Sequence, residues 1–347
     1  MAVAVSRRYS YTPRRNIRPN ARFGAPIGAP TLPRPLLLFF ALAAFLVAIG
    51  LVTRDSGDLS AVTSCSAPPC SEEPLVLGAS ATPRPSTTAV TQPRPVRSPY
   101  PIPEITGLSA YIIEEPCGAK LFAFNENTRY PPASLTKLMT ALVAAKNADL
   151  DTVITSPLDG FTLSLESDGT AMGVELGEKL SLRDLIYGML LRSGNDAALI
   201  IAQYIGGSEE EFVRMMNAEA TELGLKDTNF TNAHGLDNPR LFVSAHDIAI
   251  IAHELLSDPE LAEIVRTASY IPDWDKGPLE NINLFLTNYP GAIGVKTGFT
   301  PTANQTIVAA ATQEDRTLLV SVLHSISDYD DARALLDWAF ASTEPTC

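Results

Sequence analysis

The sequence predicts an α+β domain, with an antiparallel sheet of about five strands and helices on its faces, preceded by one transmembrane helix. Apolar residues follow strand spacing first, then helical spacing over a long middle stretch, then strand spacing again. This order places an early hairpin and the late strands in one sheet, which is typical of an α+β layout. An uninterrupted apolar run near the N-terminus predicts the transmembrane helix.

The N-terminal segment differs sharply in charge from the rest of the chain. Residues 1–54 contain eight arginines and no acidic residue, whereas the whole chain has a net charge of −13. Subtracting the +8 of this segment leaves −21 on residues 55–347. An acidic body of that size is repelled by nucleic acid, which excludes nucleic acid as a partner.

The apolar run Leu36–Val52 has 17 uncharged residues. This is the short end of the length that spans a bilayer, and it exceeds the roughly 7–15 residues of a signal-peptide core. Seven arginines precede the run, so the N-terminus should stay cytoplasmic. We expect a basic cytoplasmic tail over 1–34, a transmembrane helix over 35–53 and an extracytoplasmic remainder in a single-pass protein of the cell membrane. The alternative is a signal peptide cleaved near Ala48-Ile49-Gly50.

Residues 54–104 are rich in proline, serine and threonine, and they predict a linker. At roughly 3.1 Å per extended residue, about 50 such residues reach on the order of 150 Å. Cys65 and Cys70 are close enough in sequence to form a small disulfide, and we expect Cys117 and Cys347 to be bystanders. The cysteines form no Cys-x-x-Cys pair, so the sequence predicts neither a metal site nor a cofactor.

The globular domain is expected over 105–342. It should begin with a hairpin of two strands, Leu108–Glu114 and Lys120–Phe124, and close with three more at Ile293–Phe299, Thr306–Ala311 and Thr317–His324. Three serines that are followed three residues later by an acid predict helix starts at Ser181, Ser208 and Ser244. A closing helix carries one apolar stripe of Ala332, Leu335, Leu336, Ala339 and Phe340.

A Ser-x-x-Lys pair stands at the start of another predicted helix, after Pro131-Pro132-Ala133. Ser134 in the first turn receives the positive end of the helix dipole, which favours a developing alkoxide. Lys137 projects from the same face, close enough to accept the serine proton. The alternative is a helix N-cap followed by a solvated lysine.

Two further elements place polar groups in apolar surroundings. Ser193-Gly194-Asn195 interrupts two apolar helical stretches, although an ordinary turn between helices explains it equally well by itself. Lys296-Thr297-Gly298 lies within a predicted strand, where a buried lysine is costly unless it has a partner or a function. The glycine allows a ligand to approach the backbone closely.

In this order, Ser134-x-x-Lys137, Ser193-x-Asn195 and Lys296-Thr297-Gly298 resemble the motifs of the penicillin-recognising serine enzymes. Longer stretches, such as PPASLTKLMTALV and YPGAIGVKTGFT, resemble the low-molecular-mass D-alanyl-D-alanine carboxypeptidases over about residues 107–340. The resemblance implies a β-lactamase/transpeptidase-like domain. It also implies peptidoglycan stem peptides ending in D-Ala-D-Ala as substrates and β-lactam antibiotics as inhibitors.

The resemblance also implies roles for the catalytic residues. Ser134 would attack the D-Ala-D-Ala carbonyl and form an acyl-enzyme, with Lys137 as its general base. Ser193 and Asn195 would relay protons and hold the substrate amide.

The remaining motif would bind the substrate. Lys296 and Thr297 would hold its carboxylate, an attraction that the lysine charge also favours. Gly298 would leave room for it, and the backbone N–H groups of Ser134 and Phe299 would form an oxyanion hole.

Two residues depart from the family pattern, and both bear on substrate preference. Arg192 precedes Ser193 where relatives often have a small residue or proline, and Asn304 stands where many have glycine. The chain also stops soon after the closing helix, without the extra β-rich domain of many relatives.

Two competing functions remain open. A β-lactamase is disfavoured because no glutamate between Asn195 and Lys296 has an asparagine four residues later. A non-catalytic module that binds penicillin or peptidoglycan is disfavoured by the intact motifs. The four histidines form no metal motif and no Gly-x-Ser-x-Gly occurs, so a histidine-based serine hydrolase is not indicated. We interpret His234-Gly235-Leu236-Asp237 as a structural turn.

Overall fold

The computed structural model describes residues 100–160, 162–163 and 169–347. The predicted cytoplasmic tail and transmembrane helix, most of the linker, and Cys65 and Cys70 lie outside the described residues. Within the described part of the chain, no helix is long and apolar enough to cross a membrane.

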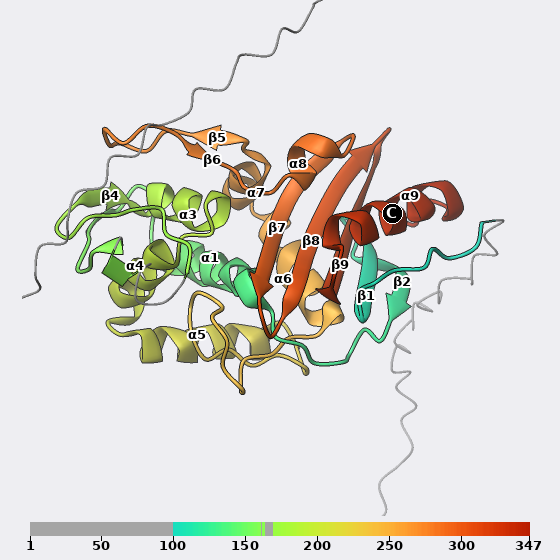
Figure 1. Cartoon of the computed structure of the whole chain (residues 1–347), viewed down its shortest axis with the longest axis horizontal. Coiled ribbons are helices and arrows are strands. Elements are labelled where there is room, and N and C mark those ends of the chain that lie inside the picture. Colours follow the sequence, from blue (N-terminus) through green and yellow to red (C-terminus); the bar gives the residue numbers. More distant parts are fainter. Residues whose placement is uncertain (1–99, 161, 164–168) are drawn as a thin grey trace, which may run out of the picture. The chain divides into compact units, whose positions relative to one another are not determined.

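A five-stranded antiparallel sheet forms the centre of the domain, in the order β2-β1-β9-β8-β7 (Figure 1). Its strands are β1 (Ser109–Glu115), β2 (Ala119–Phe124), β7 (Ala292–Thr300), β8 (Asn304–Gln313) and β9 (Arg316–Ser325). The early hairpin therefore joins the three late strands through β1 and β9, as the sequence predicts. Two-stranded pairs also occur, namely β3 (Val153–Thr155) with β4 (Lys179–Ser181) and β5 (Ser269–Tyr270) with β6 (Leu279–Glu280).

Helices cover both faces of the sheet (Figure 1). On one face, α6 (Ala245–Ser257) packs on β1 and β9, and the rest of a helical layer gathers behind it. That layer comprises α1 (Thr136–Asn147), α3 (Leu182–Leu191), α4 (Asn195–Gly206), α5 (Glu209–Glu222) and α7 (Pro259–Arg266). The other face carries α8 (Phe285–Asn288) against β7, and α9 (Asp328–Ser342) against β8 and β9.

The predicted serine caps are present. Ser181 and Asp184 form a reciprocal capping box at α3. Ser208 accepts from the Glu211 N–H at α5, and Ser244 accepts from the Asp247 N–H at α6. Each side chain satisfies a backbone donor that has no partner within its own helix. The caps therefore begin these helices at the residues that the sequence indicates.

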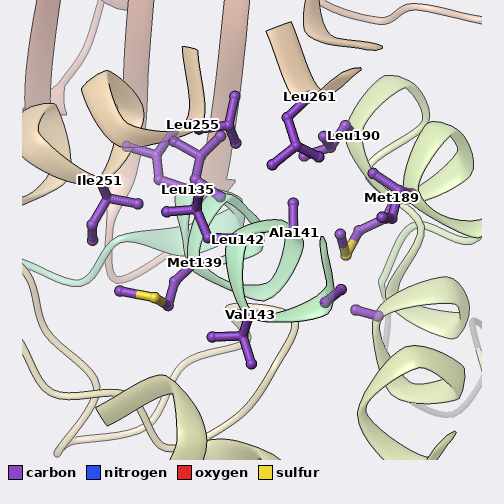
Figure 2. Close-up of a cluster of buried hydrophobic side chains, with 14 of the residues drawn as sticks. Leu135, Met139, Ala141, Leu142, Val143, Met189, Leu190, Ile251, Leu255 and Leu261 are labelled. Atoms are coloured by element: carbon purple, nitrogen blue, oxygen red, sulfur yellow. The ribbon is translucent and has the colours of Figure 1, made fainter. Parts of the chain in front are cut away.

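Helix α1 is buried on all sides over its first nine residues, since every residue from Thr136 to Ala144 is shielded from solvent. Its apolar side chains pack against those of α3, α6 and α7, among them Met189, Ile251 and Leu261 (Figure 2). A helix enclosed in this way is held by packing rather than by its own propensity. It provides a rigid support for the residues at its N-terminus.

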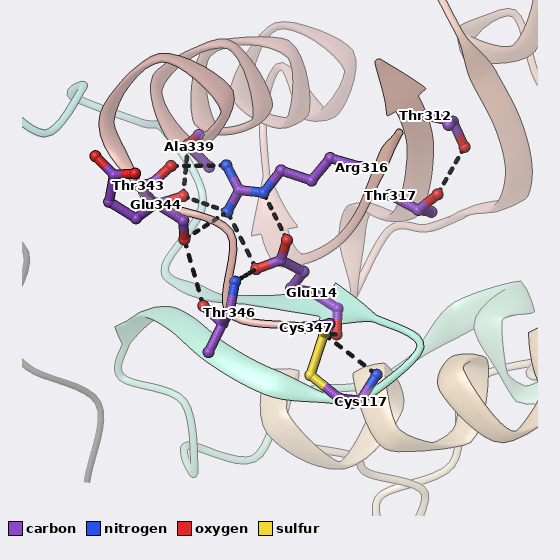
Figure 3. A network of polar contacts seen from close by, with 10 residues as sticks. All are labelled: Glu114, Cys117, Thr312, Arg316, Thr317, Ala339, Thr343, Glu344, Thr346 and Cys347. Carbon is purple, nitrogen blue, oxygen red and sulfur yellow. Dashed lines mark hydrogen bonds and ion pairs between the residues drawn. A yellow bond between two sulfur atoms is a disulfide. The ribbon is translucent and has the colours of Figure 1, made fainter. Parts of the chain in front are cut away.

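A polar network and a disulfide fix the C-terminal tail to the β1–β2 turn (Figure 3). Arg316 Nε lies 2.6 Å from Glu114 Oε1, and Arg316 Nη1 donates to the Thr343 carbonyl at 2.7 Å. Cys117 and Cys347 form a disulfide, so the expectation that they are bystanders is wrong. Because they are 230 residues apart, only the return of the chain along α9 brings them together.

Candidate active site

Ser134 lies where a short 3₁₀ turn, η1 (Ala133–Leu135), leads into α1. Ala133 has a left-handed backbone (φ 50°), which is uncommon for a residue with a side chain and typical of functional sites. This turn places the Ser134 hydroxyl on the wall of a cavity of about 710 Å³. Lys137, one turn later, points back toward it.

Lys137 is fully buried, so it is not the solvated lysine of the alternative interpretation. Its Nζ donates to Ser134 Oγ at 3.0 Å and to the His234 carbonyl at 2.5 Å. Burial holds the pKa of Lys137 well below its ordinary value, and the nearby charge of Lys296 acts in the same direction, whereas Asp196 opposes them. The amine is thus shifted toward its neutral, proton-accepting form.

The turn between α3 and α4 brings Ser193 onto the same hydroxyl. Ser193 has φ 60° and is almost fully buried, and its Oγ donates to Ser134 Oγ at 2.8 Å. Asn195 begins α4 and also lines the cavity. Because an ordinary turn would leave such groups in solvent, this geometry distinguishes the element from a simple connection between helices.

A buried carboxylate braces this turn. Asp196 is fully buried and accepts from the N–H groups of Met172 and Gly173, both at 2.9 Å. The Thr170 hydroxyl donates to the Ser193 carbonyl at 2.6 Å. The segment around Thr170 is therefore fastened across the start of α4.

Strand β7 supplies the opposite wall of the cavity. Lys296 is 1% exposed, and its Nζ donates to the Thr297 carbonyl at 2.8 Å. Burial lowers the pKa of Lys296 to about 7. A Cβ atom on Gly298 would lie 2.8 Å from the Ser134 nitrogen, so the close approach of β7 to η1 requires glycine. Phe299 is 66% exposed at the cavity edge.

The segment that we interpreted as a structural turn also lines the cavity. The His234 carbonyl accepts from Lys137, and burial lowers the pKa of the His234 imidazole to about 3. Gly235 has φ 96°, and a Cβ there would lie 1.9 Å from the Ala133 carbonyl oxygen. Asp237 accepts from the Thr300 hydroxyl at 2.7 Å, which ties this segment to β7. The turn thus orients the lysine and touches the site as well.

The structure therefore brings all eight predicted residues to the cavity: six line it, with Phe299 at its rim, and Lys137 and Lys296 lie buried directly behind its walls. Of the described residues that line the cavity, none is a lysine or an arginine. The described part of the chain also holds no group of three or more histidine, cysteine, aspartate or glutamate residues arranged to bind a metal ion.

A model of the D-alanyl-D-alanine carboxypeptidase family (peptidase S11) matches residues 94–326 of the chain. The chain belongs to this family. D-alanyl-D-alanine carboxypeptidase DacF of Bacillus subtilis is 35% identical over 68% of this chain and 62% of its own length. DacB2 of Mycobacterium tuberculosis is 33% identical over 70% of this chain and 84% of its own length. The chain thus spans less than two thirds of the Bacillus relative.

A solved structure is similar across the same region. The Streptomyces K15 DD-transpeptidase superposes with a TM-score of 0.66 at 29% identity, covering 70% of this chain and all of that one. The transpeptidase-like fold expected from the resemblance is therefore confirmed for the described domain.

Several cavity residues were not identified from the sequence. Thr170 and Tyr329 line the cavity, and Asp196 supports it from behind. Only Asp196 had a signal, since an acid directly after Ser193-Gly194-Asn195 and inside an apolar helix requires partners. Of the two departures from the family pattern, Arg192 does not line the cavity, and Asn304 has φ 54°, a backbone that favours glycine.

Proposed function

We propose that the chain is a serine-type D-Ala-D-Ala carboxypeptidase that acts on peptidoglycan stem peptides through an acyl-enzyme. The observation that carries this proposal is the row of hydrogen bonds from Lys137 Nζ to Ser134 Oγ (3.0 Å) and from Ser193 Oγ to Ser134 Oγ (2.8 Å). The Ser134 hydroxyl faces the cavity, and the Lys137 amine beside it is buried and has a lowered pKa. A neighbouring base of this kind activates a nucleophile.

In the acylation step, neutral Lys137 takes the proton of the Ser134 hydroxyl while Oγ attacks the carbonyl of the penultimate D-alanine. The N–H groups of Ser134 and Phe299 stabilise the oxyanion. The C–N bond then breaks, and the proton held by Lys137 passes through the Ser193 hydroxyl to the departing amine of the terminal D-alanine, which leaves Lys137 neutral again. Water next attacks the Ser134 ester, and hydrolysis frees the shortened peptide and restores the hydroxyl.

The remaining residues of the three motifs bind the substrate. Lys296 and Thr297 attract the terminal carboxylate, Asn195 holds the substrate amide, and Gly298 lets the peptide approach β7. β-Lactam antibiotics, which carry a carboxylate and a reactive amide, would acylate Ser134 in the same way and act as inhibitors.

The sequence pattern of the N-terminal region supports an extracytoplasmic substrate. We infer a basic cytoplasmic tail over 1–34, a transmembrane helix over 35–53, a linker over 54–104 and a catalytic domain over 105–342, on the arginine and apolar pattern alone. The intact mass of the membrane-extracted protein checks this inference, because loss of the first ~50 residues would establish a signal peptide instead.

The test of the activity uses the full chain and a peptide that ends in D-Ala-D-Ala. We expect release of free D-alanine and covalent labelling of Ser134 by a fluorescent penicillin, located by peptide mass mapping. Ser134→Ala should abolish both.

Three outcomes contradict the proposal in different ways. Labelling of the Ser134→Ala variant would refute the assignment of Ser134 as the nucleophile. Labelling of the wild type without release of D-alanine would indicate a binding module. Rapid turnover of penicillin with no peptide cleavage would indicate a β-lactamase.

A further inference from the structure

The end of the cavity that we assign to the substrate carboxylate lacks a cationic side chain on its surface. No described lining residue is a lysine or an arginine, and Lys296, which lies behind the wall, is 1% exposed and donates to the Thr297 carbonyl. On the proposed function, a peptide carboxylate must nevertheless be bound here. Hydroxyl and N–H donors on the cavity surface therefore have to supply part of its recognition.

Tyr329 presents such a donor beside Thr297. It lies in the first turn of α9 and lines the cavity together with Thr297 and Ile282. The Leu284 N–H donates to its hydroxyl oxygen at 3.2 Å, which fixes the phenol against the segment that precedes α8. The pKa of Tyr329 is raised, mainly by burial and also by the charge of Asp328, although hydrogen bonds with the Leu284 N–H and the Thr297 side chain act in the opposite direction. The two hydroxyls are thus neighbours on one wall.

The hydrogen-bonding capacity of this hydroxyl is only partly used. A phenol has one hydrogen to donate and accepts through its oxygen. The Leu284 N–H already occupies the oxygen on one side, and the Thr297 side chain is a further hydrogen-bonding neighbour. A ligand oxygen placed between the two side chains would accept from both hydroxyls, because both can rotate.

We propose that Tyr329 is a substrate-binding residue whose hydroxyl donates, beside that of Thr297, to the C-terminal carboxylate of the peptide. The inference rests on the proposed function and extends it to a residue outside the three motifs. It also explains why a tyrosine of the outer helical layer reaches through to the cavity.

The test compares Tyr329→Phe with Tyr289→Phe in the full chain. Tyr289 is a matched control, since its hydroxyl also joins two elements of the outer layer, donating to Asp337 at 2.8 Å, but it does not line the cavity. Each variant is assayed for kcat/KM on a D-Ala-D-Ala peptide and on the same peptide with a C-terminal carboxamide. Rates are compared at about pH 7.5, because burial raises the pKa of Asp328, which also lines the cavity, to about 6.

We expect Tyr329→Phe to lose about tenfold or more in kcat/KM on the free carboxylate, mainly through KM, and less than about twofold on the carboxamide. Tyr289→Phe should leave the ratio of the two substrates unchanged. An unchanged ratio in Tyr329→Phe, or an equal loss on both substrates, would overturn the inference and leave the proposed function intact. A wild-type chain that cleaves neither peptide would overturn the proposed function, and this inference with it.

Discussion

Two regions of this domain bury charged side chains, and they do so in opposite ways. Behind the cavity, Lys137 and Lys296 are buried together with like charge, and the pKa of each is lowered. Under the C-terminal tail, the buried Glu114 is paired with the opposite charge of Arg316, whose side chain is 11% exposed. Burial alone would raise the pKa of Glu114, but hydrogen bonds from Arg316 and Thr346 and the charge of Arg316 bring it below the ordinary value.

The difference separates stability from reactivity. In the Glu114–Arg316 pair each charge satisfies the other, so the charged forms are favoured and the tail is held in place. In the lysine pair the charged forms are disfavoured, so the fold loses stability whenever both are protonated. The first arrangement stabilises the structure, and the second keeps an amine ready to accept a proton.

The largest expected effect comes from replacing the proposed general base, Lys137, by an apolar side chain of similar length. We expect Lys137→Met to lower the rate of penicillin acylation at least about a thousandfold, because the Ser134 hydroxyl loses its proton acceptor. The same substitution should raise the free energy of unfolding at neutral pH, since a depressed lysine pKa penalises the folded state there. Stopped-flow acylation and urea denaturation measure the two effects.

A Lys137→Met variant that acylates at the wild-type rate would refute the general-base role. If Lys137→Met lowered the free energy of unfolding as well as the acylation rate, the contrast between the lysine pair and the Glu114–Arg316 pair would no longer hold.

The matched change in the Glu114–Arg316 pair should lower the stability of the fold and leave the acylation rate nearly unchanged. We expect Arg316→Met to reduce the free energy of unfolding by about 3–5 kcal/mol, because it leaves the buried Glu114 carboxylate without its partner. Acylation by the folded protein should stay within about twofold.

The pH dependence sharpens this second prediction. The lowered pKa of Glu114 gives stability that is present above its unfolded value and is lost as the pH falls through the folded value. The difference between wild type and Arg316→Met should therefore shrink as the pH falls below about 4.3. Urea denaturation at pH values on both sides measures it, and a constant difference would argue against the ion pair as the cause.

The smallest expected effect tests the coupling between the two lysines. Burial is the main reason for the low pKa of Lys137, and the charge of Lys296 adds to it. Lys296→Ala should therefore shift the apparent pKa of penicillin acylation upward, but leave it below the ordinary lysine value. The pH profile of second-order acylation measures the shift, for which Lys179→Ala, at an exposed position of β4, is the control. A downward shift would contradict the proposed coupling.

Local rules were sufficient to predict much of this structure from sequence. The serine caps and the five strands follow from spacing within one segment, and Ser134 and Lys137 lie on one face because they are three residues apart in a helix. The apolar neighbours of Lys137, which are Leu135, Leu138 and Met139, also indicated its burial.

Contacts between segments that are distant in sequence could not be predicted from local spacing. The Cys117–Cys347 disulfide requires the path of α9, and the contact of Tyr329 with Thr297 joins two segments that are distant in sequence. The role of the His234 carbonyl was hidden for another reason. A backbone oxygen has no signature in the residue type, so the segment was interpreted as a turn alone.

The disulfide also has a mechanical consequence. A pull applied between Tyr100 and Cys347 passes from Cys117 directly to Cys347, so the covalent path that can lengthen is only 100–117. That stretch extends to at most about 60 Å at 3.3–3.6 Å per residue. Every residue of the cavity lies between the two cysteines, inside the closed loop. A domain fastened at these two ends would therefore bear tension without transmitting it through the covalent chain that carries Ser134.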